Sequence, residues 1–333
     1  MKKIASNALK IAVPILISAG IIYYMYRDFD FSEVGNSIRE MKLVWLWFAL
    51  AFSLFGPLLR GLRWRLLLEP IGYRVPRTDL ILIVFFGYAA NIVIPRIGEV
   101  SRYALLDRRN RVPFSKGLGT WVAERFVDLI LLIAITSVTL LLQWKYFMQL
   151  FTGNRVEESA GTAQSVSGNT AHSNHIILLA SVAAIAIAIC IVLGKKYRIG
   201  QRIIQFFKDL WTGFATLKQI ERLPLFIAYS IGIWICYYLE MYLAFYCIGS
   251  IAAVGPMAGL ACFVASSVTI LIPTPNGAGP WHFAVTSMLM IYGISANDAK
   301  TFALVLHSAQ TATYLLSGAL AWVTLAATSK RRN

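Results

Sequence analysis

Two short segments of the chain place charged and hydrogen-bonding side chains, together with proline and glycine, inside apolar sequence. In residues 92–102, Arg96, Glu99 and Arg102 follow a short apolar run that ends at a proline. This run is too short to cross a bilayer, because a spanning helix needs about 20 apolar residues. The second segment, residues 272–282, reads Ile-Pro-Thr-Pro-Asn-Gly-Ala-Gly-Pro-Trp-His. We call these segments the first break and the second break.

The two breaks are expected to line a cavity in the membrane. Irregular backbone is tolerated at membrane depth only beside protein or trapped water, because unpaired N–H and C=O groups are costly in hydrocarbon. A helix that resumes after each break points its N-terminus inward, and helix N-termini attract anions. Gly277 and Gly279 are expected to leave backbone N–H groups open to a ligand. Since Arg96 and Arg102 add positive charge, a phosphate or carboxylate head group is the expected ligand, unless the arginines only pair with Glu99.

Further titratable side chains lie in apolar sequence outside the first break. Glu124 and Asp128 are four residues apart and share one helical face, which suits neutralisation of arginines across a helix interface or a place on a substrate pathway. Glu240 is the one acid deep in its apolar run and is a candidate for proton coupling, for binding a cationic head group, or for a structural hydrogen bond. His282 and His307 are candidates for titration or for hydrogen-bonded packing.

The sequence contains no pattern that indicates an enzyme. We find no serine nucleophile elbow, phosphate loop or His-rich metal cluster, so neither a cofactor nor a metal is predicted. All four cysteines lie inside apolar runs and are predicted to be buried hydrophobic residues rather than ligands: Cys190, Cys236, Cys247 and Cys262.

Composition indicates a polytopic membrane protein. Of the 333 residues, 58% are hydrophobic and only 14% are charged, and the mean hydropathy is +0.64. This leaves too little polar surface for a soluble domain of this size. The net charge of +15 comes from basic residues in short loops between apolar runs, which is how membrane orientation is encoded. Nucleic acid is therefore not an expected partner.

Loop charge sets the predicted threading. Six apolar runs are predicted to be full spans: residues 11–26, 43–59, 118–142, 176–193, 223–248 and 301–327. Basic segments favour the cytoplasmic side, so both chain ends are predicted to be cytoplasmic. By the same rule, residues 60–77 and 96–116 lie on one side, although an apolar run separates them. That run must then enter and return from the cytoplasm as a re-entrant hairpin.

A second re-entrant hairpin is predicted from the opposite face. Residues 251–292 begin and end outside by the loop-charge count, with the second break near their middle. Each hairpin lies between two full spans, so residues 43–142 and 223–327 form an inverted repeat. In that organisation, paired broken helices build a substrate site at the membrane midplane. The alternative is that each hairpin is an ordinary span of low hydropathy.

The predicted fold is therefore all-α, with about six full spans and two oppositely inserted re-entrant hairpins in a single membrane domain, residues 1–333. The segments outside the repeats are a signal-anchor helix and outer loop (1–42), a flexible outer loop (143–175), a span and cytoplasmic amphipathic segment (176–222) and a basic tail (328–333). The amphipathic segment suits the surface of an anionic leaflet or packing against the protein.

Three motifs in order resemble the flippase-like transmembrane domain of the lysylphosphatidylglycerol synthase family. They are Asn91-x3-Pro95-x2-Gly98-Glu99-x2-Arg102, Glu124-Arg125-x2-Asp128 and Ile272-Pro273-x-Pro275-x-Gly277-x-Gly279. The resemblance runs from about residue 43 to residue 327 and implies a bacterial inner-membrane protein that handles or translocates a lipid. By position, these residues match the family's motifs: Arg96, Glu99, Arg102, Glu124, Arg125, Asp128, Pro273, Gly277 and Gly279.

The chain departs from this family in two respects. Family members often carry Glu where this chain has His282, which puts in doubt a head group that is recognised through that acid elsewhere. In bifunctional members, a cytosolic aminoacyl transferase follows the membrane domain. The chain ends six residues after Ala327, so we expect that activity to be absent.

The sequence therefore predicts a protein that binds or translocates the head group of an anionic or zwitterionic lipid while the acyl chains stay in the bilayer. Arg96 and Arg102 would hold phosphate, and Glu240 or His282 would tune selectivity or coupling. The remaining candidates for substrate binding lie at or near the second break: Pro273, Asn276, Gly277, Gly279 and His307. The alternatives are a secondary transporter of a small anionic solute, an intramembrane lipid-modifying enzyme and a non-transporting scaffold; a homodimer is left open.

Overall fold

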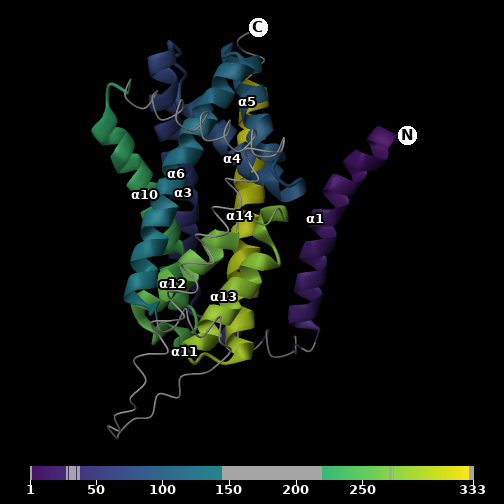
Figure 1. The fold of residues 1–333 in the computed structure, drawn as a ribbon, viewed down its shortest axis with the longest axis vertical. Helices are drawn as coiled ribbons and strands as arrows, with labels where there is room; N and C mark the ends of the chain where they lie inside the picture. The colour runs from purple at the N-terminus through teal and green to yellow at the C-terminus, as the bar shows by residue number, and fades with distance from the viewer. Residues whose placement is uncertain are drawn as a thin grey trace, which may run out of the picture.

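The computed structural model describes residues 2–27, 29, 35, 38–144, 220–269, 272 and 274–329, with side chains from residue 12 onward. Within these ranges all regular secondary structure is helical, as the sequence predicted. Four helices are long and apolar enough to cross a membrane, and they run along the long axis of the molecule (Figure 1). They are α3 (Leu43–Leu68), α6 (Phe114–Leu142), α10 (Leu223–Phe245) and α14 (Ala296–Ser329).

These four helices coincide with four of the six predicted spans. The predicted span at residues 11–26 is the C-terminal part of α1 (Lys2–Tyr26), which is a shorter apolar helix over Ala12–Tyr26. The predicted span at 176–193, the outer loop from residue 145 onward and the amphipathic segment up to residue 219 lie outside the described residues.

One predicted boundary is wrong in an informative way. The sequence ended the second span at Leu59 and assigned residues 60–77 to a cytoplasmic loop, but α3 continues to Leu68. Arg60 and Arg63 were the reason for ending the span. Both are buried in the structure, because acids on a neighbouring helix compensate their charge.

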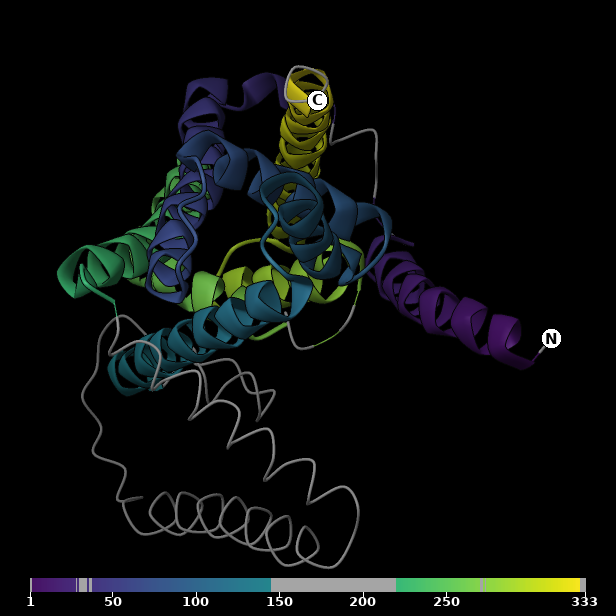
Figure 2. The same ribbon diagram turned by 90° about the horizontal axis from the view of Figure 1, so that it is seen from above.

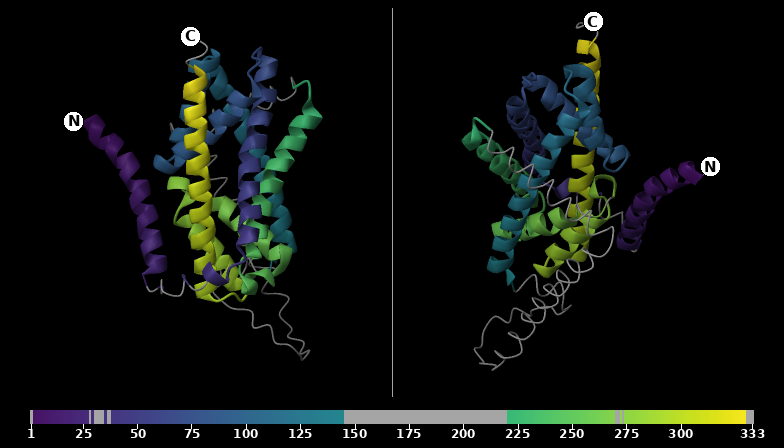
Figure 3. Two further views of the ribbon diagram at one scale, coloured as in Figure 1. Left: turned by 180° about the vertical axis from the view of Figure 1, so that it is seen from behind. Right: turned by 45° about the horizontal axis from the view of Figure 1, so that its top comes forward.

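Two pairs of shorter helices accompany the four long ones. α4 (Arg77–Val93) packs against α5 (Ile97–Asn110), and α12 (Gly255–Val268) packs against α13 (Pro280–Ile291). With 17 residues, α4 is the longest of the four and reaches only about 25 Å. The first pair lies in the upper half of Figure 1 and the second pair in the lower half. Figure 3 shows α14 running beside both pairs, and α14 packs against α4 and α13.

Local backbone rules explain the first break. Ile94 is extended (φ −134°, ψ 121°) and ends α4, because the residue before a proline is disfavoured in the helical region. Arg96 then takes a left-handed conformation (φ 64°) directly before α5 begins. In the second break, η3 (Pro275–Gly277) contains Asn276, with φ 50°, a conformation that Asn tolerates better than most residues.

Glycines allow the first helix pair to pack at backbone distance. A Cβ added to Gly98 on α5 would lie 1.9 Å from the carbonyl oxygen of Gly87 on α4. Asn91 strengthens this contact, since its Oδ1 accepts a hydrogen bond of 2.7 Å from the Gly98 N–H. A Cβ added to Gly318 on α14 would lie 2.2 Å from the Cβ of Ala89 on α4. Side chains at either glycine would force these helices apart.

Two apolar cores hold the helices together, and the remaining helices lie around them. The main apolar core lies between α10, α12, α13 and α14, and a second core lies between α3, α4 and α5. The outer faces of the long helices expose large apolar side chains, such as Leu141 and Leu316 at 83% and 73% exposure, as expected for lipid-facing positions. Figure 2 shows α1 at one side of the bundle, where it contacts α13 and η3. The short helix η1 (Glu69–Ile71) follows α3, and the short helix α11 (Gly249–Ala252) precedes α12.

Candidate functional site

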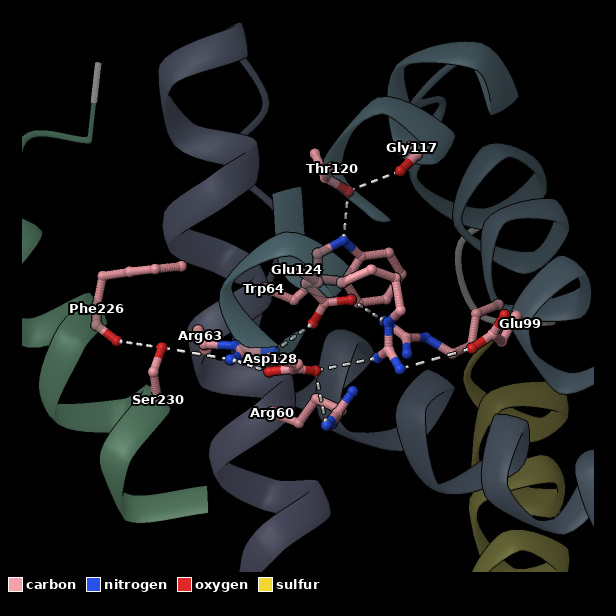
Figure 4. A network of polar contacts seen from close by, with 12 residues as sticks. Arg60, Arg63, Trp64, Glu99, Gly117, Thr120, Glu124, Asp128, Phe226 and Ser230 are labelled. Carbon is pink, nitrogen blue, oxygen red and sulfur yellow. Dashed lines mark hydrogen bonds and ion pairs between the residues drawn. The ribbon is translucent and has the colours of Figure 1, made fainter. Parts of the chain in front are cut away.

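A buried ion network joins α3, α5 and α6 near the first break (Figure 4). Arg63, on α3, is fully buried. Its Nη1 lies 2.7 Å from Asp128 Oδ1 and 3.3 Å from Ser230 Oγ, and its Nη2 lies 3.5 Å from Glu124 Oε1. One arginine therefore bridges both acids of α6, and a hydroxyl on α10 completes its environment.

Three other arginines approach the same two acids. Arg102, on α5, places Nη2 3.1 Å from Glu124 Oε2, and Arg60 places Nη2 3.1 Å from Asp128 Oδ2. Arg125 lies 3.3 Å from Asp128 and 3.8 Å from Glu99, the only acid of this group that is about one-third exposed. Glu124 and Asp128 thus neutralise arginines across helix interfaces, which was one of the two roles left open by the sequence.

Aromatic packing fixes Arg102 in this network. Its guanidinium carbon lies 4.5 Å from the centre of the Trp64 ring, a favourable cation–π arrangement. The indole N–H of Trp64 donates a 2.9 Å hydrogen bond to Thr120 Oγ1 on α6. Arg102 is therefore held by a charge and by a ring, and little of its side chain is exposed.

Sequence reasoning missed Arg63 because it counted this residue among the loop charges of residues 60–77. The signal was present in the spacing. Arg60 and Arg63 are three residues apart, as two neighbours on one helical face are, and Glu124 and Asp128 are four apart. Two such pairs on facing helices satisfy one another's charge, so the span continues through its arginines.

Arg96 differs from the other arginines of the first break. Arg96 is exposed, and its side chain makes no ion pair or hydrogen bond with any residue in the described part of the chain. Its left-handed backbone places it at the start of α5. The structure thus separates Arg96 and Arg102, which the sequence had grouped: Arg102 is compensated by Glu124, and Arg96 has no acidic partner among the described residues.

The second break forms a polar cluster with α14. Asn276 Nδ2 donates a 2.9 Å hydrogen bond to Thr311 Oγ1, and the carbonyl oxygen of Asn276 lies 3.1 Å from His307 Nε2. The rings of His282 and His307 are 4.5 Å apart. The sequence-predicted residues Asn276, His282 and His307 are therefore brought together, whereas Pro273 lies outside the described residues.

The expectation of open backbone donors in this break is wrong for both glycines. The Gly277 N–H donates to Thr274 O at 3.3 Å, and the Gly279 N–H donates to His282 Nδ1 at 3.4 Å. His282 sits three residues after Gly279, the spacing at which a side chain caps the start of a helix. The loop satisfies its own N–H groups, because a buried unpaired donor is costly.

α1 covers the outer side of the second break. Ser18 Oγ donates a 2.9 Å hydrogen bond to the carbonyl oxygen of Ala278, and a Cβ on Gly279 would lie 3.1 Å from the Ser18 carbonyl oxygen. Further along α1, Tyr26 OH donates to the Lys300 carbonyl oxygen at 3.0 Å. The N-terminal helix is therefore part of the site's wall.

The second break contacts the helix that leads into the first break. α4, which leads into the first break, contacts η3 of the second break. Tyr88 on α4 and Tyr237 on α10 share a 2.6 Å hydrogen bond between their hydroxyls. Glu240, one turn further on α10, is buried and accepts a 2.6 Å hydrogen bond from Gln310 Nε2 on α14.

Comparison with known proteins identifies the family. Residues 11–318 match the family described as the lysylphosphatidylglycerol synthase TM region. A stretch of 83 residues is 31% identical to Glycosyltransferase AglD of Haloferax volcanii, which corresponds to 25% of this chain and 13% of that protein. The chain thus spans only a small part of that relative. Because the family match extends over most of the sequence, this multi-pass membrane protein belongs to the lysylphosphatidylglycerol synthase transmembrane-region family.

Proposed function

We propose that this protein binds the head group of an anionic or zwitterionic phospholipid, or of a related lipid, where the two breaks meet, and translocates it across the bacterial inner membrane. The acyl chains remain in the bilayer while the head group passes the midplane. In this proposal, the pairs α4–α5 and α12–α13 are re-entrant hairpins of an inverted repeat, inserted from opposite faces, with both chain ends in the cytoplasm.

The observation that carries the proposal is the contact between α4 and η3. It joins the second break to the helix that leads into the first break, and these elements come from different halves of the chain and from helix pairs in opposite halves of the molecule (Figure 1). Broken helices that meet in this way are the usual setting of a substrate site in inverted-repeat transporters. Membership of a family of lipid-synthase membrane regions makes a membrane lipid the substrate class that fits best.

Arg96 is the residue that we assign to the lipid phosphate. A guanidinium group binds phosphate through paired hydrogen bonds, which requires that its donors are not already used by protein acids. Arg96 meets this condition within the described residues, whereas Arg102 is committed to Glu124 at 3.1 Å. Sequence analysis predicted the same role for both arginines, and the geometry favours a division between a binding arginine and a structural one.

Reconstitution tests this function, and the chain offers a matched control. Arg111 is also exposed, also has a left-handed backbone (φ 58°) and also flanks α5, at the opposite end. We expect purified protein in vesicles to accelerate exchange of labelled phospholipids between leaflets. Arg96→Asn should reduce this rate at least tenfold, and Arg111→Asn should leave it within about twofold, because Asn tolerates the left-handed backbone in both variants.

Two results would contradict the proposal. No acceleration for any lipid of a bacterial inner membrane would exclude translocation of those lipids. Transport of soluble glycerol phosphate without lipid exchange would instead favour the secondary transporter of a small anion. An equal loss in the Arg96→Asn and Arg111→Asn variants would remove Arg96 from the binding site and leave the function in place.

A further inference from the structure

The buried charges around the first break do not balance. Arg60, Arg63 and Arg102 are each at most 7% exposed, and the acids that they contact, Glu124 and Asp128, are at most 8% exposed. Three cations therefore face two anions. The half-exposed pair Arg125 and Glu99 adds one charge of each sign and leaves the difference unchanged. Among the described residues, the network thus carries one positive charge without a compensating acid, and such a charge is costly in a membrane interior.

Glu240 is a buried acid that has no ion-pair partner among the described cations. It is 4% exposed, and its side chain contacts the neutral amide of Gln310 at 2.6 Å. No described arginine, lysine or histidine forms an ion pair with it. Ionised Glu240 would balance the surplus charge of the arginine network, whereas protonated Glu240 would leave that surplus for a ligand.

Three tyrosines connect the two regions. Tyr237 precedes Glu240 on α10 and shares the hydroxyl–hydroxyl hydrogen bond with Tyr88, whose ring packs 5.0 Å from that of Tyr314. Tyr237 also packs against α3, since a Cβ added to Gly56, one turn before Arg60, would lie 2.8 Å from the Tyr237 ring. The tyrosines thus link the helix of Glu240 to the helix of Arg60, and charges separated by protein interior are poorly screened.

We propose that Glu240 is a proton-binding site that takes up one proton when a singly charged anionic head group enters beside the arginine network, so that the lipid anion and the proton cross together. The proton converts the Glu240 carboxylate into a carboxylic acid, and release on the other side restores the carboxylate. This inference rests on the proposed function for its substrate. It makes transport electroneutral, since one negative and one positive charge move in the same direction.

Other titratable groups surround Glu240 and are the competing candidates. The buried or half-buried ones on the helices around it are Cys236 and Tyr237 on α10, Arg60 and Arg63 on α3, Tyr88 on α4, Glu124 and Asp128 on α6, Cys262 on α12, and His307 and Tyr314 on α14. Glu124 and Asp128 are held ionised by arginines at 2.7–3.5 Å, and His307 hydrogen-bonds Asn276 in the second break. Glu240 is the acid that lacks a cation.

Infrared difference spectroscopy tests the proton site without transport. Addition of phosphatidylglycerol to the detergent-solubilised protein should increase the C=O band of a protonated carboxylic acid, and Glu240→Gln should abolish this increase. The variant retains the oxygen that accepts the Gln310 hydrogen bond, so it should fold. Glu69→Gln, at a half-exposed acid outside the network, should keep the band. A band that persists in Glu240→Gln, or that does not respond to lipid in the wild-type protein, would overturn the proposal.

A vesicle experiment tests the coupling. With phosphatidylglycerol as the labelled lipid, a gradient of one pH unit should bias the leaflet distribution up to about tenfold, and a membrane potential alone should not. Glu240→Gln should lose the response to pH and gain a response to potential. Lipid exchange that ignores pH in the wild-type protein would overturn the proton coupling and leave the lipid function standing. A band shift caused by glycerol phosphate, with no lipid exchange, would keep the proton site and refute the lipid substrate.

Discussion

Arg96 and Asn276, one in each break, both adopt a left-handed backbone, with φ of 64° and 50°. This conformation costs a residue other than glycine about 1 kcal/mol or more, and such strain concentrates at functional sites. Asn276 recovers the cost through hydrogen bonds to Thr311 and His307. The described residues provide no such partner for the Arg96 side chain. Among the described residues, no side-chain hydrogen bond therefore offsets the strain at Arg96.

Replacement of Arg96 by glycine should therefore raise stability and lower activity. Gly adopts φ near 60° without strain, so we expect Arg96→Gly to raise the apparent melting temperature slightly while lipid exchange falls at least tenfold. Arg111→Gly relieves the same strain at the other end of α5 and should retain exchange. Thermal unfolding in detergent and the vesicle assay measure the two effects. If both variants transport normally, Arg96 serves neither binding nor catalysis of passage.

Removal of Arg63 should destabilise the protein far more than removal of its near neighbour Arg65. Arg63→Ala removes the fully buried guanidinium that contacts both Glu124 and Asp128, and breaking such buried ion pairs by removing one partner costs about 3–5 kcal/mol. Arg65 is 28% exposed and pairs with Glu69 on the same helix, so Arg65→Ala should cost less than about 1 kcal/mol. Thermal unfolding of the two purified variants makes the comparison. Equal stability would show that the network does not hold α3 against α6.

Gly98→Ala should disrupt the first helix pair. The added methyl group would overlap the Gly87 carbonyl oxygen, and overpacking of this kind costs about 1–3 kcal/mol. Gly119 on α6 has no atom within 4 Å of an added Cβ, so Gly119→Ala should be neutral or stabilising by up to about 1 kcal/mol. The melting temperature should fall for Gly98→Ala and stay the same or rise for Gly119→Ala, and a stable Gly98→Ala would mean that α4 and α5 pack less closely than observed.

Single cysteines test the orientation. Ser115, before the apolar part of α6, and Ser295, before α14, are both exposed and are predicted to lie on opposite sides of the membrane. In a Cys190→Ser background, Ser115→Cys should react only with a permeant maleimide in intact cells, and Ser295→Cys should also react with an impermeant one. The native Cys236, Cys247 and Cys262 are buried. Burial also raises the pKa of the Cys247 thiol to about 11, which keeps it protonated and slow to react. The reverse labelling pattern would invert the proposed topology.

Local rules were sufficient for the breaks but not for their contacts. Pro95 ends α4 through a constraint on its neighbour Ile94, and this can be read from the sequence. The partner of Glu240, by contrast, is Gln310, 70 positions away on another helix, and no local pattern connects them. The role of Arg63 was not predicted for a related reason. Loop-charge counting treats each arginine alone, whereas the burial of an arginine depends on an acid elsewhere in the chain.

The glycine donors of the second break show the same limit. The sequence identified Gly277 and Gly279 as points of backbone freedom, and both indeed have positive φ angles of 74° and 89°. It could not show that Thr274 and His282 would accept hydrogen bonds from the N–H groups of these two glycines. The positive φ angles could be predicted from the residue type. Whether the two N–H groups were free depended on which acceptors the folded loop placed beside them.

The backbone contacts of α4 have a consequence for how the molecule can rearrange. α4 touches α5 at Gly87 and Gly98, and it touches α14 at Ala89 and Gly318, both at distances that leave no room for sliding. These three helices must therefore travel together as one rigid frame. Any opening toward one membrane face and then the other falls to α12, α13 and α1, whose contact across the second break rests on a hydroxyl and a glycine. The helices around the second break, rather than the frame of α4, α5 and α14, are thus the moving part.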